Sequence, residues 1–217
     1  MNNERKVVLV IAIFLVASGV VWFVGTDTLF CLTVSYDGAG TAENPYEVSN
    51  VEQLQCIEEQ SLYANYVQVS DIDASETSGW NLGGDFEPIG ELINPEHTTA
   101  RYSYVNSFSG TFDGRGHNTD LKIDRGSEEN VGVFGLVGTA GEVTRVSVVD
   151  RDIKGSDKVG SIVGENTVSG TVERSHATLS VDGHSRVGGL IGSNGGTVSE
   201  SYGSIESADS VEVSRQE

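Results

Sequence analysis

A pattern that recurs at a fixed spacing constrains this chain more than any other feature of its sequence. Blocks rich in valine and glycine begin at Val131, Val159 and Val187, 28 residues apart each time. Two further landmarks follow each block, a valine in a glycine-containing turn and then a serine. The valines are Val143, Val172 and Val198, and the serines are Ser147, Ser175 and Ser201. Repeats of about 20 to 50 residues are typical of solenoids, whose units pack only on their neighbours.

The repeat unit is built for strands rather than helices. Helical repeats need about ten or more residues at a period of 3.6, whereas the runs between glycines are short, as in Val143–Val149. Valine outnumbers leucine 29 to 12, and β-branched residues favour strands. We predict an all-β fold, a right-handed parallel β-helix (β-solenoid) with repeats over about 131–205. An antiparallel sandwich or barrel is the alternative, although such folds need no register of 28.

The predicted coils stack equivalent residues above one another. At an ordinary strand separation of about 4.8 Å, Val131 lies over Val159 and Val187. The same reasoning places Phe134 over Ile162 and Leu190. Glycines in this register mark corners or close approaches of one coil to the next, where a side chain has no room.

The first thirty residues predict export. After Arg5 and Lys6, residues 7–24 contain no charge, a length near the lower limit for a membrane-spanning helix. The basic flank predicts a cytoplasmic N-terminus and a single-pass protein whose domain, residues 31–217, is extracellular. Residues 1–30 are therefore a membrane anchor, or a signal peptide if the chain is cleaved near Ala17. Both alternatives place the domain outside the cell.

The two cysteines, Cys31 and Cys56, both follow the export segment. An oxidising compartment permits a disulfide between them, but their spacing alone leaves two unpaired thiols as the alternative. With no histidine cluster nearby, the pair does not indicate a zinc site.

The charge of the chain excludes one class of partner. There are 32 acidic and 13 basic residues, for a net charge of −19, which repels nucleic acid. Such a surface would also repel itself at low ionic strength, and about 1 M salt shortens the Debye length to about 3 Å. The composition is therefore typical of a salt-adapted surface, with an ordinary acidic secreted protein as the alternative.

A helix is predicted ahead of the repeats. Ser49, Asn50, Val51 and Glu52 read as a capping box at the start of a helix over about 50–60. An amphipathic helix at this place would cover the apolar end of the first coil. Residues 63–73 then read as the first strand, 80–106 as a polar loop with Phe108 and Phe112 packing inward beyond it, and 210–214 as the last strand.

In these landmarks the chain resembles the GLUG-motif proteins, which are exported bacterial and archaeal surface proteins named for a Gly-Leu-any-Gly core. Gly189–Gly192 matches that core, Ser161–Gly164 departs from it at Ser161, and Gly135–Gly138 fits it two residues late in the register. The resemblance covers about residues 38–205, including the stretch Phe108–His117. It implies a β-solenoid with an adhesin-like surface role and no established catalytic residue. The acidic composition similarly resembles exported proteins of haloarchaea.

No residue is predicted to be catalytic, cofactor-binding or metal-binding. The chain has no H-E-x-x-H, G-x-S-x-G or P-loop motif. The best catalytic candidates are Asp150, Arg151, Asp152 and Lys154. A polysaccharide lyase or glycosidase would need carboxylates and basic residues of this kind along a groove. A solvated strand edge with alternating charges explains them more simply. The pairs Asp71 with Asp73 and Asp150 with Asp152 are candidates for calcium, without a D-x-D-x-D-G loop.

The sequence therefore predicts a membrane-anchored, outward-facing structural or adhesin-like protein of the cell envelope that is not an enzyme. A polysaccharide-active β-helix enzyme is the alternative. The predicted partners are the membrane, through residues 7–24, an unidentified protein or polysaccharide ligand, and other β-solenoids that associate end to end.

Overall fold

The computed structural model describes residues 31–80, 85–91, 106–149, 151–206 and 211–216, together with two short strands near the N-terminus. The chain divides into two units, Met1–Val34 and Ser35–Glu217. In the first unit, β1 (Val16–Ala17) pairs antiparallel with β2 (Val20–Val21). The rest of the predicted anchor, residues 7–24, lies outside the described residues. No helix in the described part of the chain has the length and apolar character to cross a bilayer, so the predicted transmembrane helix is unsupported.

The second unit is a parallel β-solenoid of three complete coils. The first coil contains β6 (Thr111–Asp113), β7 (Asn118–Asp120), β8 (Ile123–Asp124), β9 (Glu129–Val131) and β10 (Phe134–Val137). The second contains β11 (Glu142–Thr144), β12 (Ser147–Val149), β13 (Ile153–Lys154), β14 (Asp157–Gly160) and β15 (Val163–Asn166). The third contains β16 (Thr171–Glu173), β17 (His176–Leu179), β18 (Val181–Asp182), β19 (Ser185–Gly188) and β20 (Ile191–Asn194).

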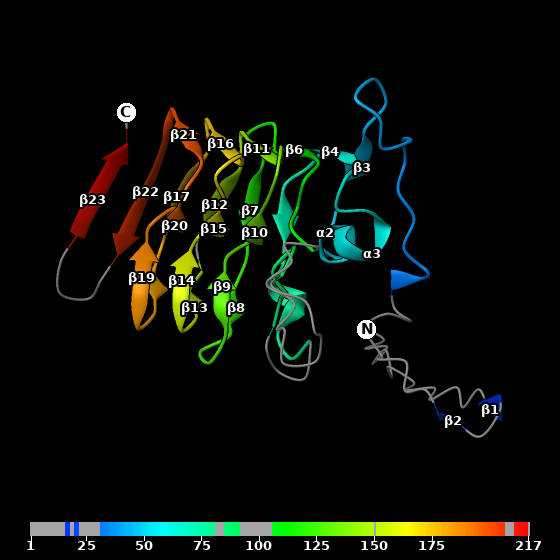
Figure 1. Cartoon of the computed structure of the whole chain (residues 1–217), viewed down its shortest axis with the longest axis horizontal. Coiled ribbons are helices and arrows are strands. Elements are labelled where there is room, and N and C mark those ends of the chain that lie inside the picture. The colour runs from blue at the N-terminus through cyan, green and yellow to red at the C-terminus, as the bar shows by residue number, and fades with distance from the viewer. Residues whose placement is uncertain are drawn as a thin grey trace, which may run out of the picture. The chain divides into compact units, whose positions relative to one another are not determined.

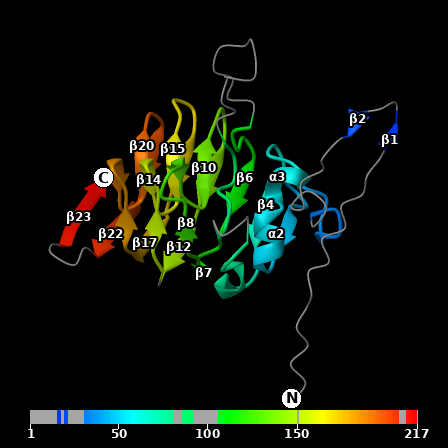
Figure 2. The same ribbon diagram turned by 90° about the horizontal axis from the view of Figure 1, so that it is seen from below.

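Elements at both ends extend these coils. Before them lie β3 (Tyr46–Val48), α2 (Val51–Gln55), α3 (Ile57–Gln60), β4 (Asn65–Gln68), β5 (Ile72–Asp73) and a 3-10 helix at Ser75–Thr77. After them come β21 (Thr197–Ser199), β22 (Ser201–Glu206) and β23 (Val211–Gln216). Equivalent strands of successive coils pair in parallel, so that five sheets run along the solenoid (Figure 1). The turned view shows the same stacking, from β10 through β15 to β20 (Figure 2).

The predicted valine register is confirmed, and the predicted phenylalanine register is wrong. Val131 pairs with Val159, and Val159 pairs with Val187. Phe134, however, pairs with Val163 rather than with Ile162. The second coil inserts one more residue than the first at the corner between Val159 and Val163, so the repeat lengthens from 28 to 29 residues there. Because the sequence landmarks were counted at a constant 28, they missed this insertion.

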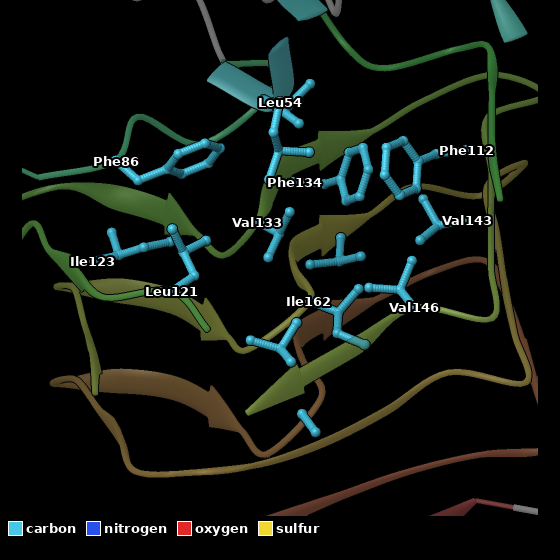
Figure 3. Close-up of a cluster of buried hydrophobic side chains, with 14 of the residues drawn as sticks. Leu54, Phe86, Phe112, Leu121, Ile123, Val133, Phe134, Val143, Val146 and Ile162 are labelled. Carbon is cyan, nitrogen blue, oxygen red and sulfur yellow. The ribbon is translucent and has the colours of Figure 1, made fainter. Parts of the chain in front are cut away.

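The core fills the inside of the coils. Its side chains are largest at the N-terminal end. One column of buried residues begins there with Tyr66 and Phe112 and continues with the smaller Val143. Phe134 lies 5.0 Å from Phe108 and 5.4 Å from Phe112 between ring centroids. Figure 3 shows this cluster, with Leu54 of α2 among the buried side chains that it draws. The prediction that Phe108 and Phe112 pack inward is confirmed.

The N-terminal cap is confirmed as a helical element, but its details differ from the prediction. Two short helices replace one continuous helix, with a break at Cys56. The cap residue is Asn50 rather than Ser49, because the Asn50 side chain accepts a hydrogen bond from the Gln53 backbone N–H at 2.9 Å. Gln53 in turn accepts from the backbone N–H of Ser49 at 2.8 Å. Asn50 and Gln53 therefore take the capping roles predicted for Ser49 and Glu52, although Gln53 accepts from the N–H of Ser49 rather than from that of the cap residue.

The other predicted segments need smaller corrections. The first strand of the solenoid is β3, and the predicted strand over 63–73 is divided into β4 and β5. Part of the predicted loop over 80–106 belongs to the coil, since Ile89 forms a parallel bridge with Phe134. The final strand, β23, is present but runs antiparallel to β22. Both cysteines of the chain are disulfide-bonded.

Candidate functional site

Polar side chains form a column on the sheet that contains β7, β12, β17 and β22. The Ser147 hydroxyl donates to Oδ1 of Asn118 at 2.8 Å and lies 3.0 Å from Nε2 of His176. The His176 ring stacks on Tyr202, with centroids 5.3 Å apart.

This serine–histidine pair is not arranged as a nucleophile with its base. Ser147 is fully buried, so a substrate has no access to its hydroxyl. Instead, hydrogen bonds between Asn118, Ser147 and His176 join three successive coils. The column is therefore a structural feature of the sheet.

Two further ladders of polar side chains follow the coil corners. Nδ2 of Asn166 donates to Oδ1 of Asn194, its partner in the next coil, at 2.9 Å. At another corner, the Ser175 hydroxyl accepts from the backbone N–H of Val146, and the Ser201 hydroxyl accepts from that of Ser175. Buried polar groups need such partners. The prediction that Ser147 shares a column with Ser175 and Ser201 is wrong, because Val146 occupies that place.

Ion pairs connect neighbouring coils on the outer surface. The Arg145 guanidinium binds Asp113 of the preceding coil, with Nε 2.8 Å from Oδ1, and Arg186 binds Asp157 in the same way, also at 2.8 Å. Both arginines occupy corners in the left-handed backbone region, with φ of 52° and 49°. The Arg186 guanidinium lowers the pKa of Asp157 to about 2. Burial raises the pKa of Asp113, but hydrogen bonds from Arg145 and the Arg115 N–H hold it below its ordinary value.

Among the predicted catalytic candidates, Arg151 and Lys154 lie beside acidic residues of adjacent coils. Asp150 lies outside the described residues. Arg151 binds the carboxylate of Asp120 in the preceding coil. Lys154 lies in register between Asp124 and Asp182, one on each neighbouring strand. The basic members of the set therefore face acidic groups of adjacent coils, as expected for a solvated sheet surface with alternating charges.

Asp71 and Asp73, one of the pairs predicted as calcium candidates, each accept a hydrogen bond from a different backbone N–H. Oδ1 of Asp71 accepts from the Asn118 N–H at 2.9 Å and lies 3.3 Å from Nδ1 of His117. Oδ1 of Asp73 accepts from the Ser75 N–H at 2.8 Å. In the described part of the chain, neither aspartate gathers with two more metal-ligating side chains.

A carboxylate in the N-terminal cap is a titratable group that sequence analysis missed. Glu58 of α3 is half-buried, and its oxygens lie 3.3 Å from the Gly90 backbone nitrogen and 3.4 Å from Nδ2 of Asn106. Burial raises the pKa of Glu58 to about 7, with further contributions from Glu91, Glu59 and Glu87, against the opposing hydrogen bond from Gly90. No sequence pattern indicates this environment, because residues 58, 90 and 106 meet only through the coil.

We expect Glu58 to make stability depend on pH between about 4.5 and 7. The folded chain binds this proton more tightly than the unfolded chain, whose glutamate has a pKa near 4.5. The stabilisation is therefore complete below pH 4.5 and is lost as the pH rises through 7. After an allowance for solvent screening of a half-buried group, Glu58→Gln should be more stable than the wild type by about 1–2 kcal/mol at pH 8.

Urea denaturation at pH 4.5 and pH 8 measures this difference. Glu47→Gln, at an exposed position on β3, is the matched control and should leave the difference between the two pH values unchanged. If Glu58→Gln keeps the wild-type difference, Glu58 does not carry the effect.

The C-terminal end of the solenoid contains a shallow hollow of about 60 Å³. Its lining has no charged residue and consists of Gly188, Gly189, Leu190, Ile191, Asn194, Val198, Ser201, Tyr202 and Gly203. The hollow lies where the apolar and asparagine columns of the solenoid end, at Ile191, Val198 and Asn194.

The comparisons with known proteins point to one relative. No family model matches the chain. Over 166 residues, or 74% of the chain, the sequence is 39% identical to halomucin from Haloquadratum walsbyi, and we infer homology over this segment. The chain spans only 2% of the length of that protein. Among solved structures, a putative immunoglobulin A1 protease from Bacteroides ovatus is similar at 14% identity and a TM-score of 0.33, over 83% of this chain and 82% of that one.

Proposed function

We propose that this chain is a structural, adhesin-like module on the outside of a haloarchaeal cell. The observation that carries the proposal is the 39% identity to halomucin of Haloquadratum walsbyi, in a chain that forms a parallel β-solenoid. The GLUG-type assignment is part of the proposal, with Gly189–Gly192 at the corner between β19 and β20. Tight glycine corners of this kind let one coil lie directly on the next.

The physical character of the solenoid supports a structural role. Side chains of its histidine, asparagine and serine columns form hydrogen bonds between coils, and arginines of one coil bind aspartates of the preceding one. Polar groups are thus used to join coils rather than to surround a substrate. The net charge of −19 suits exposure to high salt, where charge repulsion is screened.

Membrane attachment through residues 7–24, with the N-terminus in the cytoplasm, completes the proposal. Its support is the uncharged run of this segment and the basic residues Arg5 and Lys6 that precede it.

Fractionation of cells that express a C-terminally tagged chain tests these points. We expect the full chain in the membrane fraction and accessible to protease added to intact cells, and deletion of residues 7–24 should abolish membrane association. A protease-resistant chain in the cytoplasm would contradict the proposal. Cleavage of acidic polysaccharides at high salt that is lost in both Asp150→Ala and Asp152→Ala would favour an enzyme instead.

A further inference from the structure

The C-terminal end of the solenoid has strand edges without a partner in the described part of the chain. The last strands of four sheets are β18, β19, β20 and β21, whereas the fifth sheet continues from β22 to β23. An edge strand presents backbone N–H and C=O groups that can pair with another chain.

The apolar columns lose their cover at the same end. Val131 and Val159 are fully buried, while Val187, the next residue in their column, is 36% exposed. Ile191 and Val198 are only half-buried, although Val163 and Val172 before them are fully buried. An additional strand layer would cover these side chains as each earlier coil covers the one before it.

Charge does not protect this edge. No charged residue occurs from Val187 to Ser199, the longest uncharged run of the sequence outside the N-terminal segment. Natural edge strands are usually guarded by charges, proline or bulges, and this run includes none of the chain's prolines. For two chains of net charge −19, β20 and β21 are therefore strands on which they can meet without bringing carboxylates together.

In the described part of the chain, a cap covers part of the opposite end. Val51, Leu54 and Ile57 of the two cap helices are buried in the core cluster. The outer edge of β3 is occupied as well, because the Glu47 N–H donates to the Asp37 carbonyl at 2.9 Å. A second copy that meets the open strands with its own C-terminal end therefore avoids the cap.

We propose that two copies of this chain join tail to tail through β20, β21 and β23. Because the chain winds as a spiral, its sheets end at different heights along the solenoid. The sheet of β21 extends one strand layer beyond that of β20, and the neighbouring sheet, which ends at β23, extends one layer further. A twofold axis through β21 sets this strand antiparallel to its copy. The same axis places β23 of each copy opposite β20 of the other, so that the two height differences compensate. Such an interface uses one surface on both subunits.

The mass of the full chain in a mild detergent and about 1 M KCl, measured by multi-angle light scattering, tests this proposal. We expect a dimer, twice 23.0 kDa after subtraction of the detergent. In Thr197→Lys/Ser199→Lys, lysines of the two copies face each other across β21, and we expect a monomer. The control Thr171→Lys/Glu173→Lys places lysines in the same two columns one coil earlier and should remain a dimer.

Circular dichroism checks that both variants keep the fold. A wild-type monomer would overturn the proposal, including one that pairs only with a different solenoid protein. A dimer that persists in Thr197→Lys/Ser199→Lys would overturn it too, because the contact would then lie elsewhere, as in residues 7–24.

Discussion

Truncation of Phe134 to alanine is expected to lower the free energy of unfolding by about 3–5 kcal/mol. Phe134 is fully buried, and its ring contacts those of Phe108 and Phe112, so the cavity would open at the centre of the aromatic cluster. Relaxation is limited because the first coil is held by strands on both sides, through Ile89 and Val163.

Chemical denaturation in about 1 M salt measures this loss. Tyr63→Ala, which removes an aromatic ring that is 67% exposed, is the control and should change stability by less than about 1 kcal/mol. Phe134→Ile should fall between the two, since Val163 and Ile191 occupy the same column in later coils. Equal losses for Phe134→Ala and Tyr63→Ala would show that the column is not a packed core.

Replacement of Gly164 by alanine is expected to be similarly severe. A Cβ atom at this position would lie 2.4 Å from the carbonyl carbon of Asn130 and 2.7 Å from the backbone nitrogen of Val131, in the preceding coil. Backbone atoms cannot move aside as a flexible side chain can, so the two coils would have to separate. We expect a loss at or above the upper end of the about 1–3 kcal/mol that overpacking costs.

The control for this substitution is Gly126→Ala, where a Cβ atom meets nothing within 4 Å. The midpoint of thermal unfolding should fall by many degrees in Gly164→Ala and stay near the wild-type value in Gly126→Ala. A small effect at Gly164 would mean that the coils do not approach as closely as described.

The recurring part of the fold could be predicted because its cause is local and repeated. Each coil buries a valine at the same place, so Val131, Val159 and Val187 reveal the stacking without knowledge of the coordinates. The capping helices were likewise predictable from polar residues around Asn50 followed by apolar ones. The exact register between Val159 and Val163 was not, because one added residue at a corner leaves the hydrophobic pattern on either side unchanged.

The polar features were harder to predict because their partners are about a coil apart in sequence. Asp113 and Arg145 pair across 32 residues, and Asn166 and Asn194 across 28. The asparagine spacing equals the repeat, so a search for polar residues in register would have found that ladder. No such signal exists for Glu58, whose surroundings come from two segments with unrelated sequences.

Disulfide trapping between coils tests the stacking most directly. Glu142 and Thr171 are partners on adjacent strands, whereas Thr197 lies one strand further along the same column. Two cysteines can bridge when their Cα atoms are within about 7 Å, and strands are about 4.8 Å apart. On mild oxidation of the full chain, Glu142→Cys/Thr171→Cys should therefore cross-link rapidly within one molecule and Glu142→Cys/Thr197→Cys should not. Rapid cross-linking of the second pair without the first would contradict the parallel β-solenoid.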